Sequence, residues 1–302
     1  MPNPNLKDNK AKRFLGEMFR RPIKAISPSL FVKLQYRYIT KHTCHLRHPI
    51  RYTEKLQYLR LYVYPRMDEV SHLAGRAGVR DYLTELGLAD LLVPVYGIYD
   101  RFDDIPFAEL PSSFVLKCTH ASGWNILVRK KDELDMEEAK RKFDDWLKRD
   151  YGRFTLERHY SKIKPQIIIE EFLGDGVNLP TEYKIHVFNG KAKNLYVVTG
   201  RGVDIRYTQL YIDWTPFDGS QFNGWKKADV TPARPADFDE MVGYAEKISS
   251  PFPFVRADFY EVDGKIYFSE MTFTPAKGTL ILDDDKTDFL MGEWLDISKY
   301  QK

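Results

Sequence analysis

Apolar and polar residues alternate along four segments in the second half of the chain, a period typical of half-buried strands. The predicted strands cover residues 182–187, 192–199, 255–261 and 265–271. Each pair is joined by a dipeptide, Asn189-Gly190 or Asp263-Gly264, that readily takes the positive φ angles of a two-residue turn. We therefore expect two antiparallel hairpins.

Helical periodicity and continuous apolar runs complete the pattern. Helices are predicted over residues 53–62, 68–86, 135–150, 238–249 and 288–297, and buried strands over 91–99, 111–117 and 164–173, with a further strand ending at 128. We expect the first of these helices to begin at a Thr53 cap. Residues 11–40 predict amphipathic helices, broken near Pro22 and Pro28, that either pack on the body or lie on a bilayer surface. Residues 214–225 predict a loop.

The hairpin over residues 255–271 brings acidic side chains together. Alternation places Arg256 and Asp258 on one face of its first strand, and antiparallel pairing brings Glu270 beside Asp258. Adjacent carboxylates repel, so they need a proton, a cation or strong donors between them. Mg²⁺ bound by carboxylates and substrate phosphates meets that need. A solvated charged face on an ordinary hairpin is the alternative, and the charges alone favour it.

Three further predicted strands carry polar side chains, at a strand end or on one face, where they could bind a ligand. Lys117 ends an apolar strand before a small polar loop, which can lay a Lys and backbone N–H groups over phosphates or can be an ordinary hairpin. The neighbouring Cys118 points to the opposite face and is expected to be a buried structural thiol. Glu170-Glu171 ends a buried strand before Gly174, where a flat heterocycle could bind exposed backbone. A third strand places three polar side chains on one face, either a wet edge or a ligand site: Glu182, Lys184 and His186.

Composition narrows the class of protein. A hydrophobic fraction of 43% with 14% aromatic residues is inconsistent with a disordered chain, and no apolar run approaches the ~20 residues of a membrane span. The N-terminus shows no apolar segment of a signal peptide, and the two cysteines provide neither a disulfide framework nor a zinc site. We expect a globular protein in the cytoplasm.

Charge is distributed unevenly, although the net charge is only +3. Residues 1–60 hold 14 Lys or Arg against three acids, and subtraction from the totals of 46 and 43 leaves 32 against 40 for the rest. Such a basic segment attracts an anionic partner, which we expect to be a membrane surface or a polyanionic glycan and not nucleic acid. A solvated helix face explains the charge equally well.

Five short motifs follow one another along the chain: Lys117 before its loop, Glu170-Glu171, EYK at 182–184, RAD at 256–258 and EMT at 270–272. This order resembles that of ATP-grasp enzymes. The surrounding segments FVLKCTHASG, IIIEEFL, FPFVRADFY and YFSEMTFTP are similar to the teichuronopeptide-biosynthesis, or TupA-like, branch of that superfamily. The resemblance covers about residues 50–297.

The resemblance implies an α+β ATP-grasp fold, in which two α+β lobes grip ATP between antiparallel sheets. We expect a basic helical N-terminal extension over residues 1–60 and a segment that precedes the ATP-grasp region over 61–110. The small lobe would cover 111–172, and the large lobe with the metal site would cover 173–302.

The same resemblance implies which residues contact the phosphates. Lys117 would contact the α- and β-phosphates of ATP. The loop from His120 to Asn125, which includes Ser122 and Gly123, would close over the triphosphate.

The resemblance also implies contacts to the adenosine part of ATP. Glu170 would accept a hydrogen bond from the adenine amine, Glu171 and Leu173 would offer backbone atoms, and Glu182 would hold the ribose hydroxyls. Arg76 stands where many relatives carry a Lys, which keeps the charge but changes the reach.

Catalytic and metal-binding roles are implied for the remaining motif residues. Lys184 would face the γ-phosphate, and Arg256 would neutralise the acyl phosphate and the tetrahedral intermediate. Asp258 and Glu270 would bind Mg²⁺. Thr272 takes the place of an Asn that is the third ligand in many relatives, and a neutral hydroxyl is the poorer ligand. Such a site suits phosphoryl transfer, which needs positioning and charge neutralisation.

The implied activity is that of an ATP- and Mg²⁺-dependent carboxylate–amine ligase that forms an amide through an acyl phosphate. Its partners would be an amino acid and a uronic acid or glutamyl chain of a cell-surface glycan, whether free, nucleotide-linked or lipid-linked. The basic N-terminus could contact the inner face of the membrane. The alternatives are a phosphotransferase on the same scaffold and an inactive glycan-binding scaffold. Lys277, after Pro275, either grips a substrate carboxylate or faces water.

Overall fold

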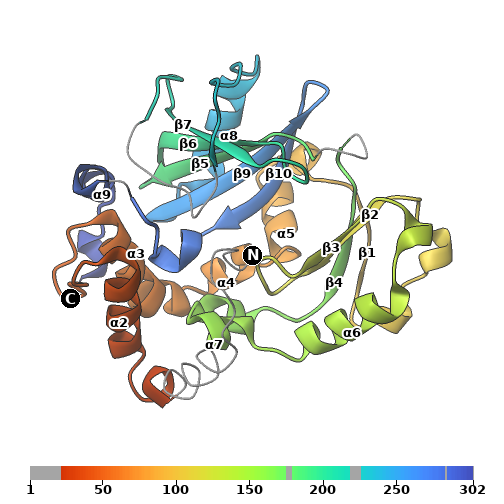
Figure 1. Ribbon diagram of the computed structural model, residues 1–302, viewed down its shortest axis with the longest axis horizontal. Helices are drawn as coiled ribbons and strands as arrows, with labels where there is room; N and C mark the ends of the chain where they lie inside the picture. Colours follow the sequence, from red (N-terminus) through yellow and green to blue (C-terminus); the bar gives the residue numbers. More distant parts are fainter. Residues whose placement is uncertain (1–21, 175–178, 218–225, 283, 302) are drawn as a thin grey trace.

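The computed structural model describes residues 22–301 apart from 175–178, 218–225 and 283, and it shows an α+β chain built on two sheets. The smaller sheet has the strand order β1-β4-β2-β3, and the larger has the order β10-β9-β5-β6-β7-β8. Figure 1 shows the smaller sheet to the right of the larger one, with helices around both. The predicted α+β class is confirmed.

The small lobe is the four-stranded sheet with its covering helix. Its strands are β1 (Val95–Tyr99), β2 (Phe114–Cys118), β3 (Asn125–Val128) and β4 (Ile167–Glu171), and neighbouring strands are antiparallel. Alternation buries Phe114, Leu116 and Cys118 in a core shared with Phe143 of α6 (Met136–Leu147). Burial raises the pKa of Cys118 to about 12, which agrees with the prediction of an unreactive structural thiol.

The large lobe contains both predicted hairpins. Its strands are β5 (Glu182–Phe188), β6 (Lys191–Thr199), β7 (Arg206–Tyr211), β8 (Lys226–Lys227), β9 (Phe254–Val262) and β10 (Lys265–Thr272). The turn residues Asp263 and Gly264 have φ angles of 52° and 75°, as a two-residue turn requires. In the sheet Asp258 lies opposite Glu270 on one side and opposite Lys184 on the other. The predicted pairing of the two acids is confirmed.

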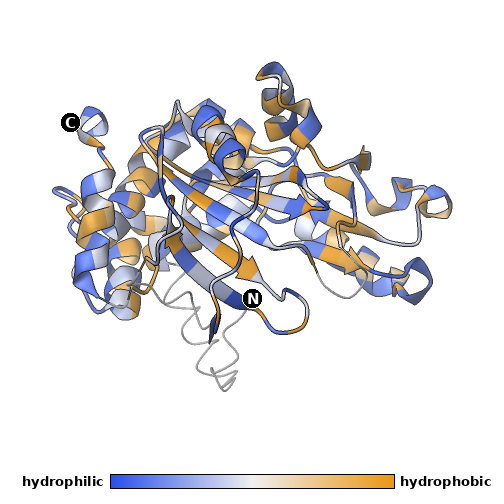
Figure 2. Cartoon of the chain, turned by 90° about the horizontal axis from the view of Figure 1, so that it is seen from above, coloured by the Kyte–Doolittle hydropathy of each residue, from blue (hydrophilic) through white to orange (hydrophobic). Residues whose placement is uncertain are grey.

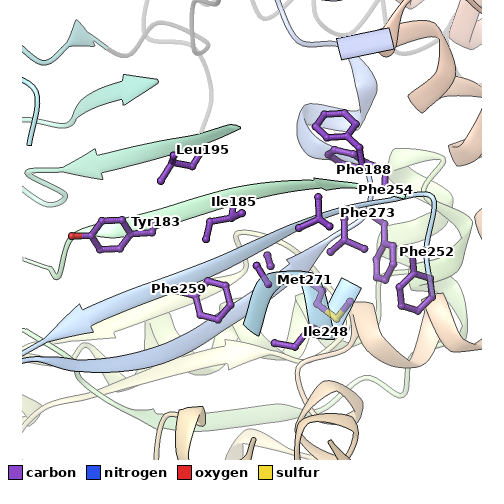
Figure 3. Close-up of a cluster of buried hydrophobic side chains, with 14 of the residues drawn as sticks. Tyr183, Ile185, Phe188, Leu195, Ile248, Phe252, Phe254, Phe259, Met271 and Phe273 are labelled. Carbon is purple, nitrogen blue, oxygen red and sulfur yellow. The ribbon is translucent and has the colours of Figure 1, made fainter. Parts of the chain in front are cut away.

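The two faces of the large sheet have opposite character. Ile185, Phe259 and Met271 lie on the core face, where they pack with Ile248 of α8 (Phe238–Ser249), as Figure 3 shows. Figure 2 shows the resulting mixture of hydrophobic and hydrophilic positions along the strands. Because side chains alternate, the polar residues of β5, β9 and β10 share the other face. That face is turned toward the small lobe.

Most predicted helices are present, with shifted ends. The other helices are α2 (Pro28–Thr40), α3 (Tyr52–Tyr58), α4 (Asp68–Ala74), α5 (Gly78–Glu85), α7 (Tyr151–Thr155) and α9 (Asp285–Trp294). The predicted helix over 68–86 is wrong in one respect, because α4 ends at Ala74 and α5 begins only at Gly78. The break lets the Arg76 N–H donate to Thr119 O of the small lobe at 3.2 Å.

The predicted Thr53 cap is wrong. Helix α3 begins one residue earlier, and the Glu54 carboxylate accepts from the backbone N–H of Ile50 and Arg51 at 3.1 and 3.2 Å. The Thr53 hydroxyl instead donates to Asp288 Oδ2 in α9 at 2.7 Å. The Thr53 hydroxyl, which the local sequence predicts as the helix cap, therefore forms a tertiary hydrogen bond to α9 instead.

Helix α2 packs on the body through one side only. Val32 and Tyr36 are buried, whereas Leu30, Leu34 and Tyr38 are exposed and form a stripe on the outer side. No helix in the described part of the chain is long and apolar enough to cross a membrane. The predictions for residues 11–21 and for part of the loop over 214–225 fall outside the described residues.

Candidate active site

A cavity of about 480 Å³ lies between the two lobes. Strands β2, β3 and β4 provide one wall, and the polar face of β5, β9 and β10 provides the other. The structure brings most of the predicted site residues to this cavity: Arg76, Lys117, Ser122, Gly123, Glu170, Glu171, Leu173, Glu182, Lys184, Arg256, Glu270 and Thr272.

Lys117 and Glu170 form an ion pair on the small-lobe wall. Their strands are antiparallel neighbours, and alternation turns both side chains away from the lobe's core. Burial would raise the pKa of Glu170, but Lys117 and Arg76 outweigh it and lower the pKa. The carboxylate is therefore charged, and it holds the Lys117 ammonium at the cavity.

An apolar slot lies beside this pair. Val93, Val115 and Leu127 line it together with Leu173. The Glu171 N–H donates to Pro94 O at 2.9 Å, so this N–H is already occupied. Apolar walls with a few backbone groups are typical of sites for flat ligands.

Lys184 links two acids on the large-lobe wall. Its ammonium donates to Glu182 Oε1 at 2.9 Å and to Asp258 Oδ2 at 2.5 Å. Arg201 donates to the second oxygen of Glu182 at 2.5 Å. Burial would raise the pKa of Glu182, but Lys184 and Arg201 outweigh it and lower the pKa.

Arg256 connects Asp258 to the cavity. Its Nε and Nη2 donate to the two oxygens of Asp258, both at 2.7 Å, and Nη2 also donates to Thr272 Oγ1 at 3.0 Å. Asp258 is 0% exposed and lies behind the cavity wall. Burial would lower the pKa of Arg256, but Asp258 and Glu270 outweigh it and raise the pKa, so the guanidinium stays charged.

Of the paired acids Asp258 and Glu270, Glu270 is the one that lines the cavity. Its side chain is 30% exposed, and it lies 3.4 Å from Arg256 Nη2 and 3.6 Å from Arg76 Nη2. Burial would raise its pKa, but Arg76, Lys184 and Arg256 outweigh it and lower the pKa to about 2. Its charge is thus balanced by cations from both lobes.

Residues 54–296 match the family described as TupA-like ATP-grasp. The chain belongs to the TupA-like ATP-grasp family. The resemblance inferred from the five motifs is confirmed, and with it the ATP-grasp fold. No curated protein matches the chain.

Solved structures of ATP-grasp ligases are similar to this family member at low identity. D-alanine–D-alanine ligase from Bacillus anthracis, complexed with ATP, is 15% identical with a TM-score of 0.44, over 68% of this chain and 57% of that chain. The enzyme of the same name from Helicobacter pylori is 14% identical with a TM-score of 0.44, over 82% of this chain and 67% of that chain. The ATP-grasp ligase PsnB, complexed with a precursor variant, Mg and ADP, is 10% identical with a TM-score of 0.41, over 78% of this chain and 60% of that chain. The family assignment depends on the sequence match and not on these likenesses.

The oxygen atoms of this TupA-like chain fit a hard cation at one place. The Glu270 carboxylate faces the cavity, and the Thr272 hydroxyl lies 3.3 Å from its Oε1. Both oxygens of Asp258 already accept from cations, so Asp258 can join only if Lys184 or Arg256 moves away. Among the described residues no three His, Cys, Asp or Glu side chains form a metal-binding group. The Glu270 carboxylate suits Mg²⁺ shared with phosphate oxygens, whereas Thr272 Oγ1 already accepts from Arg256 Nη2 at 3.0 Å. All three predicted ligands, Asp258, Glu270 and Thr272, stay predictions.

His120 departs from its predicted place. Its ring is buried against Trp124, with Nε2 3.3 Å from Trp146 O, and it is not among the residues that line the cavity. Of the same loop, Ser122 and Gly123 do reach the cavity. Ser122 has a small side chain and Gly123 has none, so the loop can approach the cavity there, whereas the His120 imidazole packs against Trp124.

Several cavity residues carry no signal in the sequence. Arg201 follows β6 in a turn, Tyr151 is the first residue of α7, and Glu157 follows that helix. Helix α7 has no motif of its own. The placement of these residues depends on packing between segments that are distant along the chain. For Lys277 the sequence leaves two roles open, contact with a substrate carboxylate or with water. In the structure Lys277 lines the cavity.

Proposed function

We propose that the cavity binds ATP and that the chain uses it to join a carboxylate to an amine through an acyl phosphate. One observation carries the proposal: four cations from two lobes, Arg76, Lys117, Lys184 and Arg256, converge on one cavity beside an apolar slot. A polyanion with a flat heterocycle complements both features. Family membership supports the same ligand.

Each residue has a role in the proposed reaction. Lys117 and Lys184 neutralise the phosphates while a carboxylate oxygen of the acceptor attacks the γ-phosphorus and ADP leaves. Arg256 neutralises the acyl phosphate while the amine nitrogen attacks its carbonyl carbon; the bond from this carbon to the phosphate oxygen breaks, inorganic phosphate leaves, and the nitrogen loses a proton to solvent. Bound at Glu270 and Thr272, Mg²⁺ would supply further neutralisation of phosphate charge. The resulting bond is an amide.

We further propose that the adenosine part lies in the apolar slot. Val115 and Leu127 would flank the ring, the backbone at Glu171 and Leu173 would hydrogen-bond its edge, and Glu182 would accept from the ribose hydroxyls. In this arrangement the Glu170 carboxylate reaches the adenine amine only if it exchanges its bond with Lys117.

The acceptor we propose is a uronic acid or glutamyl carboxylate of a cell-surface glycan, free or linked to a nucleotide or lipid, and the amine is that of an amino acid. Family membership and the charge of the N-terminal region support this choice. Helix α2 presents Lys33 and Arg37 beside its exposed apolar stripe, so a peripheral contact with an anionic membrane at its cytoplasmic face belongs to the proposal.

The test is release of ADP by the purified chain, with Mg²⁺, glucuronate or poly-glutamate and a set of amino acids. We expect release only when both a carboxylate and an amino acid are present, with free phosphate as the second product. Glu270→Gln should lose turnover and stay folded.

Two outcomes would replace the proposal. A phosphorylated acceptor that accumulates without an amine would indicate a phosphotransferase. Nucleotide binding without turnover in any combination would indicate a scaffold.

A further inference from the structure

A second group of side chains reaches the cavity from α7 and from the turn after β10. We call Tyr151, Glu157, Thr274 and Lys277 the α7–β10 wall. None of them has a role in the proposed binding of ATP. The Tyr151 hydroxyl hydrogen-bonds the Ser122 side chain, so this wall also contacts the loop of the small lobe.

The turn that carries Lys277 has an unusual backbone. Ala276, Lys277 and Gly278 are consecutive left-handed residues with φ angles of 47°, 59° and 65°. Two of the three carry side chains, which makes this conformation costly unless its surroundings enforce it. Such strain is common where a side chain is held for binding.

Buried donors enforce the turn. Gln57 Nε2 and Arg60 Nη1 both donate to Lys277 O, at 2.7 and 2.9 Å. Arg60 is almost fully buried and also donates to Thr155 O at the end of α7. The Arg60 guanidinium therefore links the two segments of the α7–β10 wall, which fixes the position of Lys277 relative to Glu157.

Lys277 and Glu157 carry opposite charges on one wall without pairing. Within the described residues the Lys277 ammonium has no carboxylate within 4.0 Å. One oxygen of Glu157 accepts from Thr274 Oγ1, and the residue as a whole is 5% exposed. Partly desolvated charges that do not meet each other are costly unless a ligand pairs with each of them.

We infer that Lys277 and Glu157 bind the amine substrate as a free α-amino acid, with Lys277 on its carboxylate and Glu157 on its ammonium group. The inference rests on the proposed function, because it names the amine of that reaction. A uronate carries a carboxylate alone and would leave Glu157 without a cationic partner from the ligand. A zwitterion matches both charges.

The test measures ligand-induced shifts of the unfolding temperature of the full chain with Mg²⁺ and a non-hydrolysable ATP analogue. The probes are the standard L-amino acids, and the one that stabilises most is compared with its amide and its N-acetyl derivative. Each derivative lacks one charge and should bind about tenfold more weakly, since a hydrogen bond between charged groups is lost.

In Lys277→Met the acid and its amide should bind alike, and in Glu157→Gln the acid and its N-acetyl form should bind alike. Lys286→Met and Glu109→Gln, at exposed positions, are the matched controls and should keep both preferences.

The outcomes separate this inference from the proposed function. If the nucleotide stabilises the chain but no amino acid does, the inference is wrong and the ATP site stands. If the N-acetyl derivative or glucuronate binds as well as the amino acid, with the same dependence on Lys277, the wall takes a simple carboxylate and the zwitterion is wrong. If the nucleotide itself has no effect, the proposed function fails first.

Discussion

Arg256 shows how much depends on single charges in this site. Its guanidinium binds both oxygens of the fully buried Asp258 and reaches Glu270 and Thr272 at the cavity. A buried carboxylate that loses its main partner keeps the desolvation cost without compensation. Arg256 is thus expected to support the fold as well as the chemistry.

Replacing Arg256 with Met should lower the free energy of unfolding by about 3–5 kcal/mol, the usual cost of breaking a buried ion pair. Urea denaturation at neutral pH measures it. Lys130→Met is the control, because Lys130 pairs with Glu133 on the surface and its loss should not be measurable. Equal midpoints for the two variants would show that Asp258 does not need the guanidinium.

Glu270 predicts a pH dependence of stability. Its pKa of about 2 lies below that of an unfolded glutamate, near 4.3, because neighbouring cations outweigh burial. The charged form therefore stabilises the folded chain above pH ~5, and this contribution is lost as the pH falls toward 2. Glu270→Gln should be less stable than wild type at pH 7, and the difference should shrink steadily below pH ~4.5. A difference that stays constant down to pH ~3 would mean that Glu270 has no depressed pKa.

At the scale of elements, the turn over residues 275–278 is constrained by its contacts with α3. Gly278 has a φ of 65°, and a Cβ there would lie 2.8 Å from Gln57 Nε2 and 3.1 Å from Leu56 Cβ. Gly278→Ala should cost about 1–3 kcal/mol, from the left-handed backbone and the close approach of α3.

Gly243 provides the matched control for that prediction. It lies within α8, and a Cβ there would meet no atom within 4 Å. Gly243→Ala should raise stability by about 0.5–1 kcal/mol, as helix propensity predicts. Thermal or urea denaturation of the two variants should move in opposite directions, and a shift of Gly278→Ala in the stabilising direction would contradict the account of the turn.

Helix α2 gives a prediction for the proposed membrane contact. Leu30 and Leu34 are 48% and 50% exposed, and the basic residues Lys33 and Arg37 lie beside them on the helix. The chain should co-sediment with vesicles that contain phosphatidylglycerol and not with phosphatidylcholine vesicles. Each Lys or Arg near an anionic surface contributes about 1 kcal/mol to the free energy of binding. Changing both leucines to Ser should abolish the binding, and retained binding would assign it to another surface.

Strands and turns followed from the sequence because their signals are local. Alternation placed Glu182 and Lys184 on one face. The turn at Asp263-Gly264 sets a register that would place Ser269 opposite Asp258, and an irregularity between Phe268 and Glu270 shifts the pairing by one residue, so that Glu270 lies there instead. The Thr53 cap failed for the opposite reason, since its hydroxyl bonds Asp288, 235 positions away. Local patterns do not include such contacts.

The same limit applies to the candidate site. Motif order located the cavity residues, but it did not show that both Asp258 oxygens are already occupied by Arg256 and Lys184. Nor did it show that Arg60 supports the Lys277 turn, a contact across 217 positions. The imidazole of His120 was misplaced because aromatic packing with Trp124 decides its direction.

At the scale of the whole molecule, both lobes present cations to one cavity, and the small lobe adds apolar residues. The small lobe contributes Lys117 and an apolar slot, and the large lobe contributes Lys184, Arg256 and Glu270. The proposed division of the chain at residues 60, 110 and 172 stays a prediction. Residues 52–60 contribute Tyr52, Leu56 and Leu59 to the core of the large lobe, so any such division leaves a shared core.

Titration calorimetry with a non-hydrolysable ATP analogue and Mg²⁺ tests the central claim most directly, because that claim is a nucleotide clamped between the lobes. We predict one nucleotide bound per chain, and affinity reduced about tenfold or more in a folded Lys117→Met variant, which loses a charged contact to phosphate. A folded wild-type chain that binds no adenine nucleotide, or a Lys117→Met variant with unchanged affinity, would contradict the account.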